Sequence, residues 1–599
     1  MAFGQAALAL CGRREWSWLS PAVGLALLTA LCWATVRLPG DGVASAIAML
    51  VVTLGCALFL RGRVEGLGEA VRVGAPVALL ALAAASLPFI VEGRFGILGT
   101  SFNPDMSQHL LAADRLAHGE GGQLLSQGYP LGPHAIVVAL GKGLGVGPVQ
   151  GFGGLTLAVA VLASLTALGA LAELPGGRRT LGALLVGLPY LVASYLAQGA
   201  FKETMQALFV LGFAIGLWEL SRRRAAVDGG NPGALGAVPL AVLAAGSVFA
   251  YSFPGLVWLL GAVAIWAALE MLRVRGTPGG AAALVRMGWR LGWPALVVFA
   301  VLTAPELGRM LDFREFETFD PGGPGLGNLF GQISPAEALG IWPSGDFRLS
   351  PGDGAVPAVG FYAGVALALA LLAYGVAWWL RRGEAAIPAA LAAAGGVYVA
   401  ARAGGTPYTA AKAVEMAAPL AALVIVRPML SFEPAGLRPG SLAAVVKPAL
   451  AAAFAAGAAG CSLLALGNAP VGPAGYSPAL TGLRPELAGS STLVLAPSDF
   501  LADEHGTPYI AWELRGGRVC IEPAVTPAPP SRPNSSPPQG VRFVITWAGS
   551  GPQPPFSDLQ LQRRAGSYLL WRRPGPLRGP SACPLIAVRV ARQGEKQGG

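Results

Sequence analysis

The sequence predicts an α-helical protein that crosses a membrane many times. Of its 599 residues, 54% are hydrophobic and only 12% are charged, whereas soluble domains carry roughly 25% charged residues. Long apolar runs recur along most of the chain, and their lengths of about 16 to 24 residues suit helices that span a bilayer. The scarcity of charge and the repeated apolar runs together assign the chain to the multi-pass membrane class.

Counting these runs gives about thirteen membrane-spanning helices. The expected spans lie near residues 18–37, 43–60, 72–91, 149–172, 179–198, 202–220, 236–251, 253–272, 289–305, 359–380, 386–401, 409–428 and 444–467.

Basic residues in the short connections set the expected orientation. Arginine clusters fall in alternate connections, so all of them reach the same side of the membrane. Short cytoplasmic loops carry an excess of arginine and lysine, so this side is expected to be cytoplasmic, together with the N-terminus. The clusters are Arg13 with Arg14, Arg61 with Arg63 and Arg72, Arg178 with Arg179, Arg222 to Arg224, Arg273 to Arg290, Arg381 with Arg382, and Arg427 with Arg438.

This orientation places three long pieces on the extracytoplasmic side. Two are loops near residues 92–148 and 306–358, and the third is the C-terminal region 470–599. The chain therefore divides into a transmembrane domain, 1–469, and a smaller extracytoplasmic domain. Because the inner connections are short, the chemistry is expected outside.

The C-terminal region is expected to be a small β-rich or α/β domain. Short runs of β-branched and aromatic residues bounded by turn residues are typical of strands. A Pro/Ser-rich stretch, 523–540, is expected to be an extended insertion. The predicted strands begin at Ser491, Tyr509, Arg518, Val541, Tyr568 and Leu585.

The six cysteines show no metal-ligand spacing. Four lie in or near apolar spans, where a packing role is expected. Cys520 and Cys583 both fall in the C-terminal region, where an extracytoplasmic location would allow a disulfide. The sequence leaves open whether the two are bonded.

The first outer loop carries the main candidate for chemistry, Asp105 in Asn-Pro-Asp-Met-Ser-Gln-His. Ionisable groups at a membrane face are costly and often mark a function. A helix that begins here would place His109 on the same face, with Asp114 further along. A carboxylate so placed can take a proton from an acceptor hydroxyl. The alternative is structural: the helix dipole favours an acid at a helix N-terminus, and a lone histidine is often only a hydrogen-bonding residue.

A second segment of this loop runs from Tyr129 to His134 and reads Tyr-Pro-Leu-Gly-Pro-His. It is rigid and aromatic and leads into an apolar, helix-like run. It either shapes a binding cleft, with Tyr129 against a sugar and His134 in the site, or is a turn into an interfacial helix.

Lysine is scarce, and Lys202 and Lys412 lie at predicted outer ends of spans, against the usual bias. Each has an acidic companion on its own segment: Glu203 is adjacent to Lys202, and Glu415 follows Lys412 by three residues. An ammonium at that depth can hold a lipid-linked phosphate. The alternatives are snorkelling from a helix end and an ion pair within one helix.

The second outer loop is the most charged part of the transmembrane domain. Arg309 or Arg348 can bind a phosphate, and Trp342 can stack on a sugar ring or anchor at the lipid headgroups. The alternative is a solvated lid in which the charges pair with one another.

Several functions lack sequence support. No P-loop, Gly-x-Ser-x-Gly, His-Glu-x-x-His or Cys-x-x-Cys signature is present. The net charge of +10 is explained by the loop arginines, and no basic run interleaved with aromatics indicates a nucleic-acid surface. No diagnostic metal-ligand set occurs, and assistance by Mg²⁺ or Mn²⁺ stays open.

The layout resembles the GT-C superfamily of membrane glycosyltransferases, many-helix proteins that use polyprenyl-phosphate-linked sugars. Asp105 occupies the place of the acidic catalytic residue that these enzymes carry in the first large outer loop. The pair Lys202-Glu203 and the segment from Tyr408 to Lys412 are similar to segments of bacterial members. In many members the first large loop follows the first span, whereas here it follows the third, as two additional N-terminal helices would explain.

The resemblance implies a reaction on the extracytoplasmic side of the plasma membrane. The composition, rich in Ala, Gly and Arg, is typical of a high-GC bacterium, so a bacterial membrane is expected. Asp105 would act as general base for a glycan, lipid or protein acceptor. Lysines 202 and 412 or an outer-loop arginine would stabilise the departing polyprenyl phosphate, and Tyr408 would contact sugar or acceptor. The alternatives are a glycan polymerase or ligase, a transporter or flippase, and a non-catalytic scaffold for envelope assembly.

Overall fold

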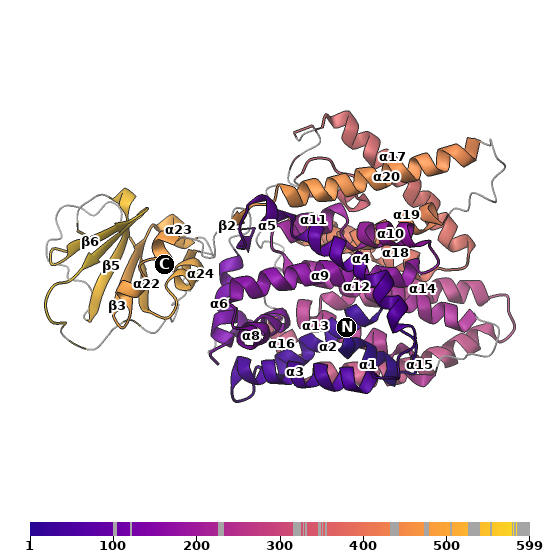
Figure 1. Ribbon diagram of the computed structural model, residues 1–599, viewed down its shortest axis with the longest axis horizontal. Helices are drawn as coiled ribbons and strands as arrows, with labels where there is room; N and C mark the ends of the chain where they lie inside the picture. Colours follow the sequence, from indigo (N-terminus) through magenta and orange to yellow (C-terminus); the bar gives the residue numbers. More distant parts are fainter. Residues whose placement is uncertain are drawn as a thin grey trace, which may run out of the picture. The chain divides into compact units, whose positions relative to one another are not determined.

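The computed structural model (Figure 1) describes the chain as two units, one helical and one built on a β-sheet. Unit 1 comprises Met1–Arg94 and Ala113–Val471, and unit 2 comprises Phe95–Ala112 and Gly472–Gly599. The residues described are all except 100–104, 120–122, 226–232, 315–324, 327–328, 330–331, 346–348, 350–351, 354–355, 432–441, 473–477, 503–505, 525–539, 551–553, 578, 580–582 and 584–599.

Unit 1 confirms the expected helical membrane class. Among the described residues, eleven helices are long and apolar enough to cross a bilayer, or up to twelve if one bent pair is a single span. The eleven are Asp41–Leu60 (α3), Leu67–Ala85 (α4), Pro148–Leu171 (α9), Phe201–Arg223 (in α12), Ala234–Tyr251 (η1 and α13), Gly255–Val274 (α14), Gly280–Phe313 (α15, η2 and α16), Ala358–Arg381 (α17), Ala386–Gly404 (α18), Pro407–Leu430 (α19) and Val446–Gly467 (in α20).

Two of the expected spans differ from simple membrane helices. The span expected at 179–198 is broken into α10 (Gly176–Gly187) and α11 (Tyr190–Ala197), which meet at 54°. Pro189 lies in the break and lacks the N–H that a continuous helix needs. The span expected at 18–37 corresponds to α2 (Ser20–Thr35), whose 16 residues reach about 24 Å.

Shorter helices complete the α-helical elements before residue 471. They are α1 (Ala2–Leu10), α5 (Leu87–Val91), α6 (Met106–Leu116), α7 (Gln123–Ser126), α8 (Gly132–Leu144) and the 3₁₀ turn η4 (Pro335–Leu339). Two-residue strands, β1 (Ile97–Leu98) and β2 (Val471–Gly472), mark the places where the chain passes between the units.

Helix α12 runs through the middle of unit 1 in Figure 1, and α19 packs against it. Of the candidate spans they are the most buried, with 89% of each apolar window inside the protein, whereas the corresponding share is 6% for α3 and 17% for α15. Helix α12 (Phe201–Ala225) packs on α9, α13 and α19, and α19 packs on α10, α17 and α18. Polar groups on these two helices therefore need partners inside the bundle.

Unit 2 contains the β-structure expected near the C-terminus. Its five-stranded sheet has the order β4-β3-β5-β7-β6. Strand β3 runs parallel to β4 and β5, and β7 runs antiparallel to β5 and β6. The strands are β3 (Ser491–Ala496), β4 (Arg518–Pro523), β5 (Val541–Trp547), β6 (Gln560–Ala565) and β7 (Tyr568–Arg572).

One of the expected strands is wrong, and the sheet contains one strand that the sequence did not predict. The run that begins at Tyr509 belongs to helix α24 (Gly506–Glu513), because a short apolar run does not distinguish strand from helix and Pro508 suits a first helical turn. Strand β6, with five of its six residues exposed, lacks the apolar alternation that would reveal it. The strand expected from Leu585 lies outside the described residues.

Both faces of this sheet are covered. Val494 and Ala496 of β3 face a core that includes residues of α21 (Pro478–Thr481), α22 (Arg484–Leu487) and α24, with Phe500 of α23 (Ser498–Ala502) packed against it. Leu493 faces a second core with Trp571 and Cys583. Successive strand residues point to opposite faces, so β3 is buried on both. In Figure 1, α22, α23 and α24 lie along one side of the sheet.

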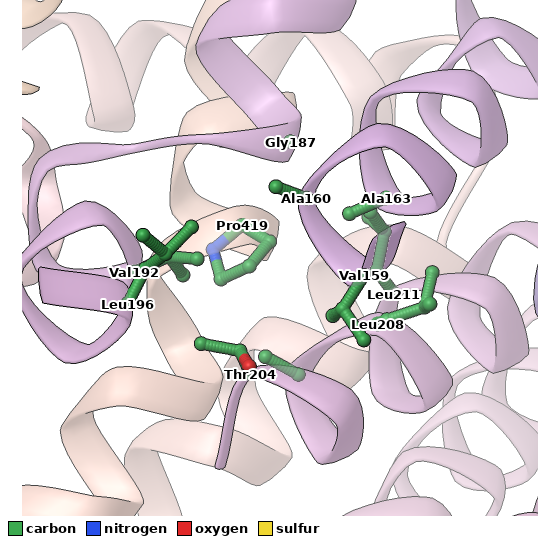
Figure 2. Close-up of a pocket in the computed structure, with 11 residues that line it drawn as sticks. Val159, Ala160, Ala163, Gly187, Val192, Leu196, Thr204, Leu208, Leu211 and Pro419 are labelled. Atoms are coloured by element: carbon green, nitrogen blue, oxygen red, sulfur yellow. The ribbon is translucent and has the colours of Figure 1, made fainter. Parts of the chain in front are cut away.

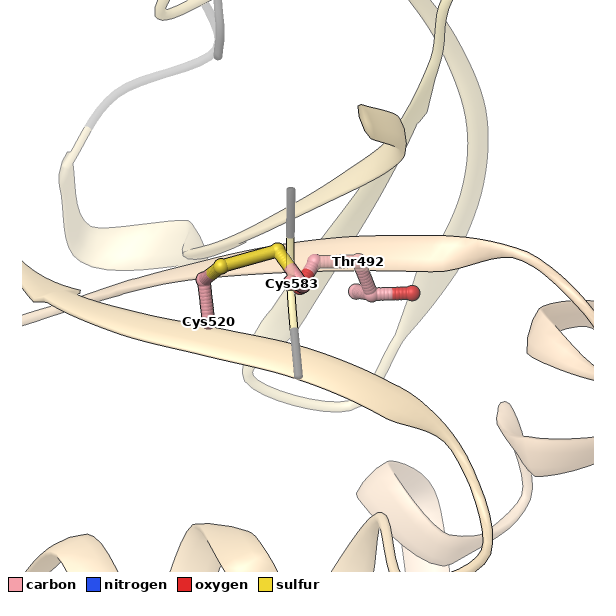
Figure 3. Close-up of a disulfide and its surroundings, with 3 residues drawn as sticks. All are labelled: Thr492, Cys520 and Cys583. Atoms are coloured by element: carbon pink, nitrogen blue, oxygen red, sulfur yellow. A yellow bond between two sulfur atoms is a disulfide. The ribbon is translucent and has the colours of Figure 1, made fainter. Parts of the chain in front are cut away.

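Cys520 of β4 is bonded to Cys583 (Figure 3). The two Cα atoms are 5.1 Å apart, within the usual range for a disulfide. The bond closes a loop across 63 residues and fixes Cys583 against β3, where its Sγ lies 3.7 Å from the carbonyl oxygen of Thr492.

Replacing Cys520 with Ser is expected to lower the stability of unit 2 by about 2–4 kcal/mol, because a bond closing a loop of this length restricts the unfolded chain. Limited proteolysis at increasing temperature, read by cleavage within residues 472–599, measures the effect. Cys56→Ser, at a free cysteine, is the matched control. Equal protease resistance of Cys520→Ser and wild type would contradict the expectation.

Candidate functional site

Lys202 and Glu203 lie in the first turn of α12, where the helix meets the break after α11. Both side chains are buried, and Glu203 is only 5% exposed. An acid in a first helical turn is favoured by the helix dipole. The dipole alone does not compensate a buried charge, so the carboxylate needs a cation.

That cation comes from α19. Pro407 begins the helix, and the side chain of Thr406 caps it by accepting a hydrogen bond from the backbone N–H of Thr409 at 3.2 Å. The helix then carries Lys412 inward, and its Nζ lies 3.1 Å from Oε1 of Glu203. Along the sequence, Glu415 is the acidic companion of Lys412 on the same segment. In the structure, Lys412 instead forms an ion pair with Glu203 of α12.

Each lysine also lies over the face of a tyrosine ring. Lys412 Nζ is 4.1 Å from the ring centroid of Tyr408, and Lys202 Nζ is 4.0 Å from that of Tyr129. Cation–π contacts of this kind are strongest where water is excluded. Two ammonium groups therefore stand within electrostatic range of one carboxylate, Glu203. We call Tyr129, Lys202, Glu203, Tyr408 and Lys412 the lysine cluster.

His134 lies in an aromatic cage beside this cluster. Its ring meets Phe152 at 5.3 Å, Phe201 at 5.6 Å and Tyr129 at 6.4 Å between centroids, in edge-to-face geometry each time. Phe201 directly precedes Lys202, so these contacts fix the start of α12. In this structure His134 is a packing residue next to the site, and its expected chemical role stays a prediction.

Arg309 holds the backbone of the Tyr129 segment. It donates to the carbonyl oxygens of Gly128 and Tyr129 and pairs with Glu306. Glu306 also accepts from Trp33 Nε1 at 2.6 Å and from Arg37 at 2.5 Å. The guanidinium is thus already engaged, and the contacts give Arg309 a positioning role. A phosphate contact by Arg309 remains a prediction.

Asp105 and His109 form a pair within unit 2. Asp105 directly precedes α6, and its backbone oxygen accepts from the N–H of Gln108 at 2.9 Å. Oδ2 of Asp105 lies 3.2 Å from Nε2 of His109, the contact that the four-residue spacing predicts. The carboxylate is partly exposed and the imidazole is buried. A carboxylate oriented by an imidazole is suited to accept a proton.

The remaining expected site residues are placed differently. Trp342 is 4% exposed and packs edge to face on Phe361, with 5.0 Å between centroids, so neither ring face is open to a sugar. Asp114 is half-buried on α6. Arg348 and the Asn103-Pro104 turn lie outside the described residues.

The small cavity in Figure 2, which Thr204 at the start of α12 helps to line, does not form a substrate site. It is lined by α9, α10, α11, α12 and α19, and nearly all of its surface is apolar. Its volume of about 10 Å³ is at the lower limit of the space that one water molecule needs. Among the described residues, no group of three or more His, Cys, Asp or Glu side chains could hold a metal ion.

Two tyrosines near the lysine cluster were not among the candidate residues that the sequence singled out. Tyr195 of α11 and Tyr251 of α13 lie within electrostatic range of Lys412 and Glu203. Both are tyrosines inside apolar runs, a pattern equally typical of membrane packing. Only the fold brings them together with the lysine cluster.

Lys412→Met is expected to destabilise the protein by about 3–5 kcal/mol, because it leaves Glu203 buried without its cation. The double variant Lys412→Met with Glu203→Gln is expected to recover most of the loss. Thermal unfolding in detergent measures both. Glu69→Gln, which removes the exposed ion pair between Glu69 and Arg72, is the control and should leave the Tm unchanged. If Lys412→Met and Glu69→Gln shift the Tm equally, the buried pair does not have the expected role.

No protein-family model and no curated protein sequence matches the chain. Among solved structures, arabinofuranosyltransferase AftD from Mycobacteria is similar over 84% of this chain, with a TM-score of 0.48 and 16% identity. The match covers 42% of AftD, so this chain spans less than half the length of that protein. ArnT from Cupriavidus metallidurans, bound to undecaprenyl phosphate, is similar over 85% of this chain and 99% of its own, with a TM-score of 0.46 and 13% identity. Apo ArnT gives 0.46 at 14% identity over 86% of this chain and all of its own. With identities of 13–16% and TM-scores below 0.5, these similarities do not identify the activity of this chain.

Proposed function

We propose that the chain is a membrane glycosyltransferase that moves a sugar from a polyprenyl-phosphate donor to a cell-envelope glycan, lipid or protein acceptor. The observation that carries the proposal is the lysine cluster. It holds two ammonium groups, one on a buried and one on a largely buried side chain, within range of one bonded carboxylate, and cations so placed favour an anion.

The surroundings of the cluster indicate the kind of anion. Lys202 and Lys412 sit at the starts of the two most buried spans. A phosphate that reaches them must bring an apolar group able to lie among membrane helices. A polyprenyl phosphate meets both requirements, and lysine binds phosphate as a point charge.

A second cluster supports an extracytoplasmic location for the lysines. At the other ends of α12 and α19, Arg427 pairs with Glu173 at 3.0 Å and with Glu384 at 3.3 Å, and Arg222 pairs with Glu173 at 2.8 Å. Lys412 and Arg427 are 15 residues apart on one helix, about 22 Å along its axis. If the arginine-rich end is cytoplasmic, as the positive-inside rule predicts, the lysine end faces outward.

In the proposed reaction Asp105 accepts the proton of the acceptor hydroxyl. The new glycosidic bond forms as the bond from the anomeric carbon to the phosphate oxygen breaks. The electron pair of that bond goes to the polyprenyl phosphate, whose added charge Lys412 and Lys202 stabilise, a contribution that is large in a site without water.

The bent pair α10–α11 favours a second candidate, a flippase or transporter of a lipid-linked phosphate. Broken helices line the substrate sites of many transporters, and α11 contributes Tyr195 near the lysine cluster. Such a protein would move the lipid without cleaving it, so release of polyprenyl phosphate separates the two candidates.

Asp105→Asn is expected to lower kcat by about 10²–10⁴, because a positioned base contributes that much, while the KM for the donor stays unchanged. The assay is release of polyprenyl phosphate by protein reconstituted with a panel of polyprenyl-phosphate sugars. Asp499→Asn, at an exposed acid of unit 2, is the control and should leave kcat unchanged. Full activity of Asp105→Asn would favour the polymerase or ligase alternative.

Lys412→Arg and Lys202→Met are expected to raise the donor KM by roughly tenfold to a hundredfold, since a hydrogen bond to a charged group is worth about 1.5–3 kcal/mol. Steady-state kinetics at fixed acceptor concentration measure the effect. Lys142→Met, at an exposed lysine on α8, is the control. Unchanged donor KM in both cluster variants would remove the basis of the proposal.

A further inference from the structure

Glu415 is a buried acid whose carboxyl group is unbonded in the part of the chain that the structure describes. It is 0% exposed, and neither of its carboxyl oxygens has a hydrogen-bond partner among the described residues. It follows Lys412 by three residues, so the two share a face of α19. A buried carboxyl group normally has its oxygens bonded, so this one needs an explanation.

The charges around Glu415 indicate that it is a neutral acid. Lys412, the cation on its own helix, is bonded to Glu203 at 3.1 Å. Glu415 lies within electrostatic range of the Glu203 carboxylate on α12 and of the phenols of Tyr195 on α11 and Tyr251 on α13. A second ionised carboxylate here would be buried, unpaired and close to a like charge, which is strongly disfavoured. Complete burial, the two unbonded oxygens and the nearby Glu203 carboxylate therefore all favour the neutral form of Glu415.

Binding of a phosphate by Lys412 creates a difficulty that Glu415 resolves. When Lys412 turns to the phosphate, its ion pair with Glu203 breaks. Glu203 would then be an uncompensated buried charge, and its cost would count against binding. Glu415 lies within electrostatic range of that carboxylate. A neutral carboxylic acid that moves into contact with it can donate an O–H hydrogen bond, and such charge-assisted bonds are strong.

We propose that Glu415 holds a proton which it shares with Glu203 when Lys412 is released to the phosphate of a lipid-linked substrate. The inference rests on the proposed function and adds a positioning residue to it. One ion pair breaks, one ammonium–phosphate contact forms, and one carboxylic acid–carboxylate hydrogen bond forms. The proton stays within the pair of acids, so no external donor is needed.

Affinity for undecaprenyl phosphate tests the sharing step, with the full chain reconstituted in lipid nanodiscs. Glu415→Gln keeps an N–H donor and is expected to bind within about twofold of wild type, whereas Glu415→Met has none and is expected to bind about tenfold or more weakly. Adding Glu203→Gln to Glu415→Met removes the stranded charge and is expected to restore binding. Wild-type affinity in Glu415→Met, or no rescue by Glu203→Gln, would overturn the inference.

Infrared spectroscopy of the same samples tests the proton directly. Wild type is expected to show a protonated carboxylic C=O band that is absent in Glu415→Gln and that shifts when undecaprenyl phosphate is added. Glu337→Gln, at another buried acid, is the control and should retain this band. This measurement decides the matter even if Glu415→Met fails to fold.

The two proposals fail in different ways. Absence of a Glu415 band overturns the inference whatever the activity of the protein. A wild-type chain that shows the band but binds no undecaprenyl phosphate overturns the proposed function. It also overturns the proposed transfer of Lys412 from Glu203 to the phosphate.

Discussion

The ion pair between Lys412 and Glu203 joins the two most buried spans, α12 and α19, at the ends where they begin. Charges are tolerated in such a place only if their partners are held in good geometry. The pair requires that α12 and α19 present these two side chains to each other, and Glu415, three residues after Lys412, lies on the same side of α19. The lysine cluster, which includes both members of the pair, depends on this arrangement.

The opposite ends of the same helices show what a purely structural ion network looks like. Arg427 is buried between the rings of Trp218 and Trp379, at 4.6 Å from each centroid, and both of its carboxylate partners are shared with Arg222. Every charge in that network has an opposite charge beside it. At the lysine end Glu203 is bonded to Lys412, and Glu415 lacks a hydrogen-bond partner among the described residues. This difference distinguishes the candidate site from an ion-pair network that only stabilises the fold.

Much of the site was accessible from residue types and spacing. The pair Asp105 and His109 follows from a four-residue interval on a helix, and the structure shows that contact. Lys202 and Lys412 were conspicuous because cations are rare at such positions. An ion pair of Lys412 with Glu415 on its own helix was one alternative from the sequence, but packing of α12 on α19 supplies Glu203 as the partner instead. Trp342, expected to face a sugar, is buried on Phe361, since aromatic composition cannot separate a binding surface from a core.

The sequence by itself determined the membrane class, nearly all the spans and the β-structure near the C-terminus, because these depend on local hydrophobicity and periodicity. The tertiary structure decided three things: where the span at 179–198 breaks, that residues 509–512 are helical, and which side chains meet across helices. Such contacts depend on the relative rotation of packed helices, a quantity that no single segment contains. The lysine cluster is a product of that rotation.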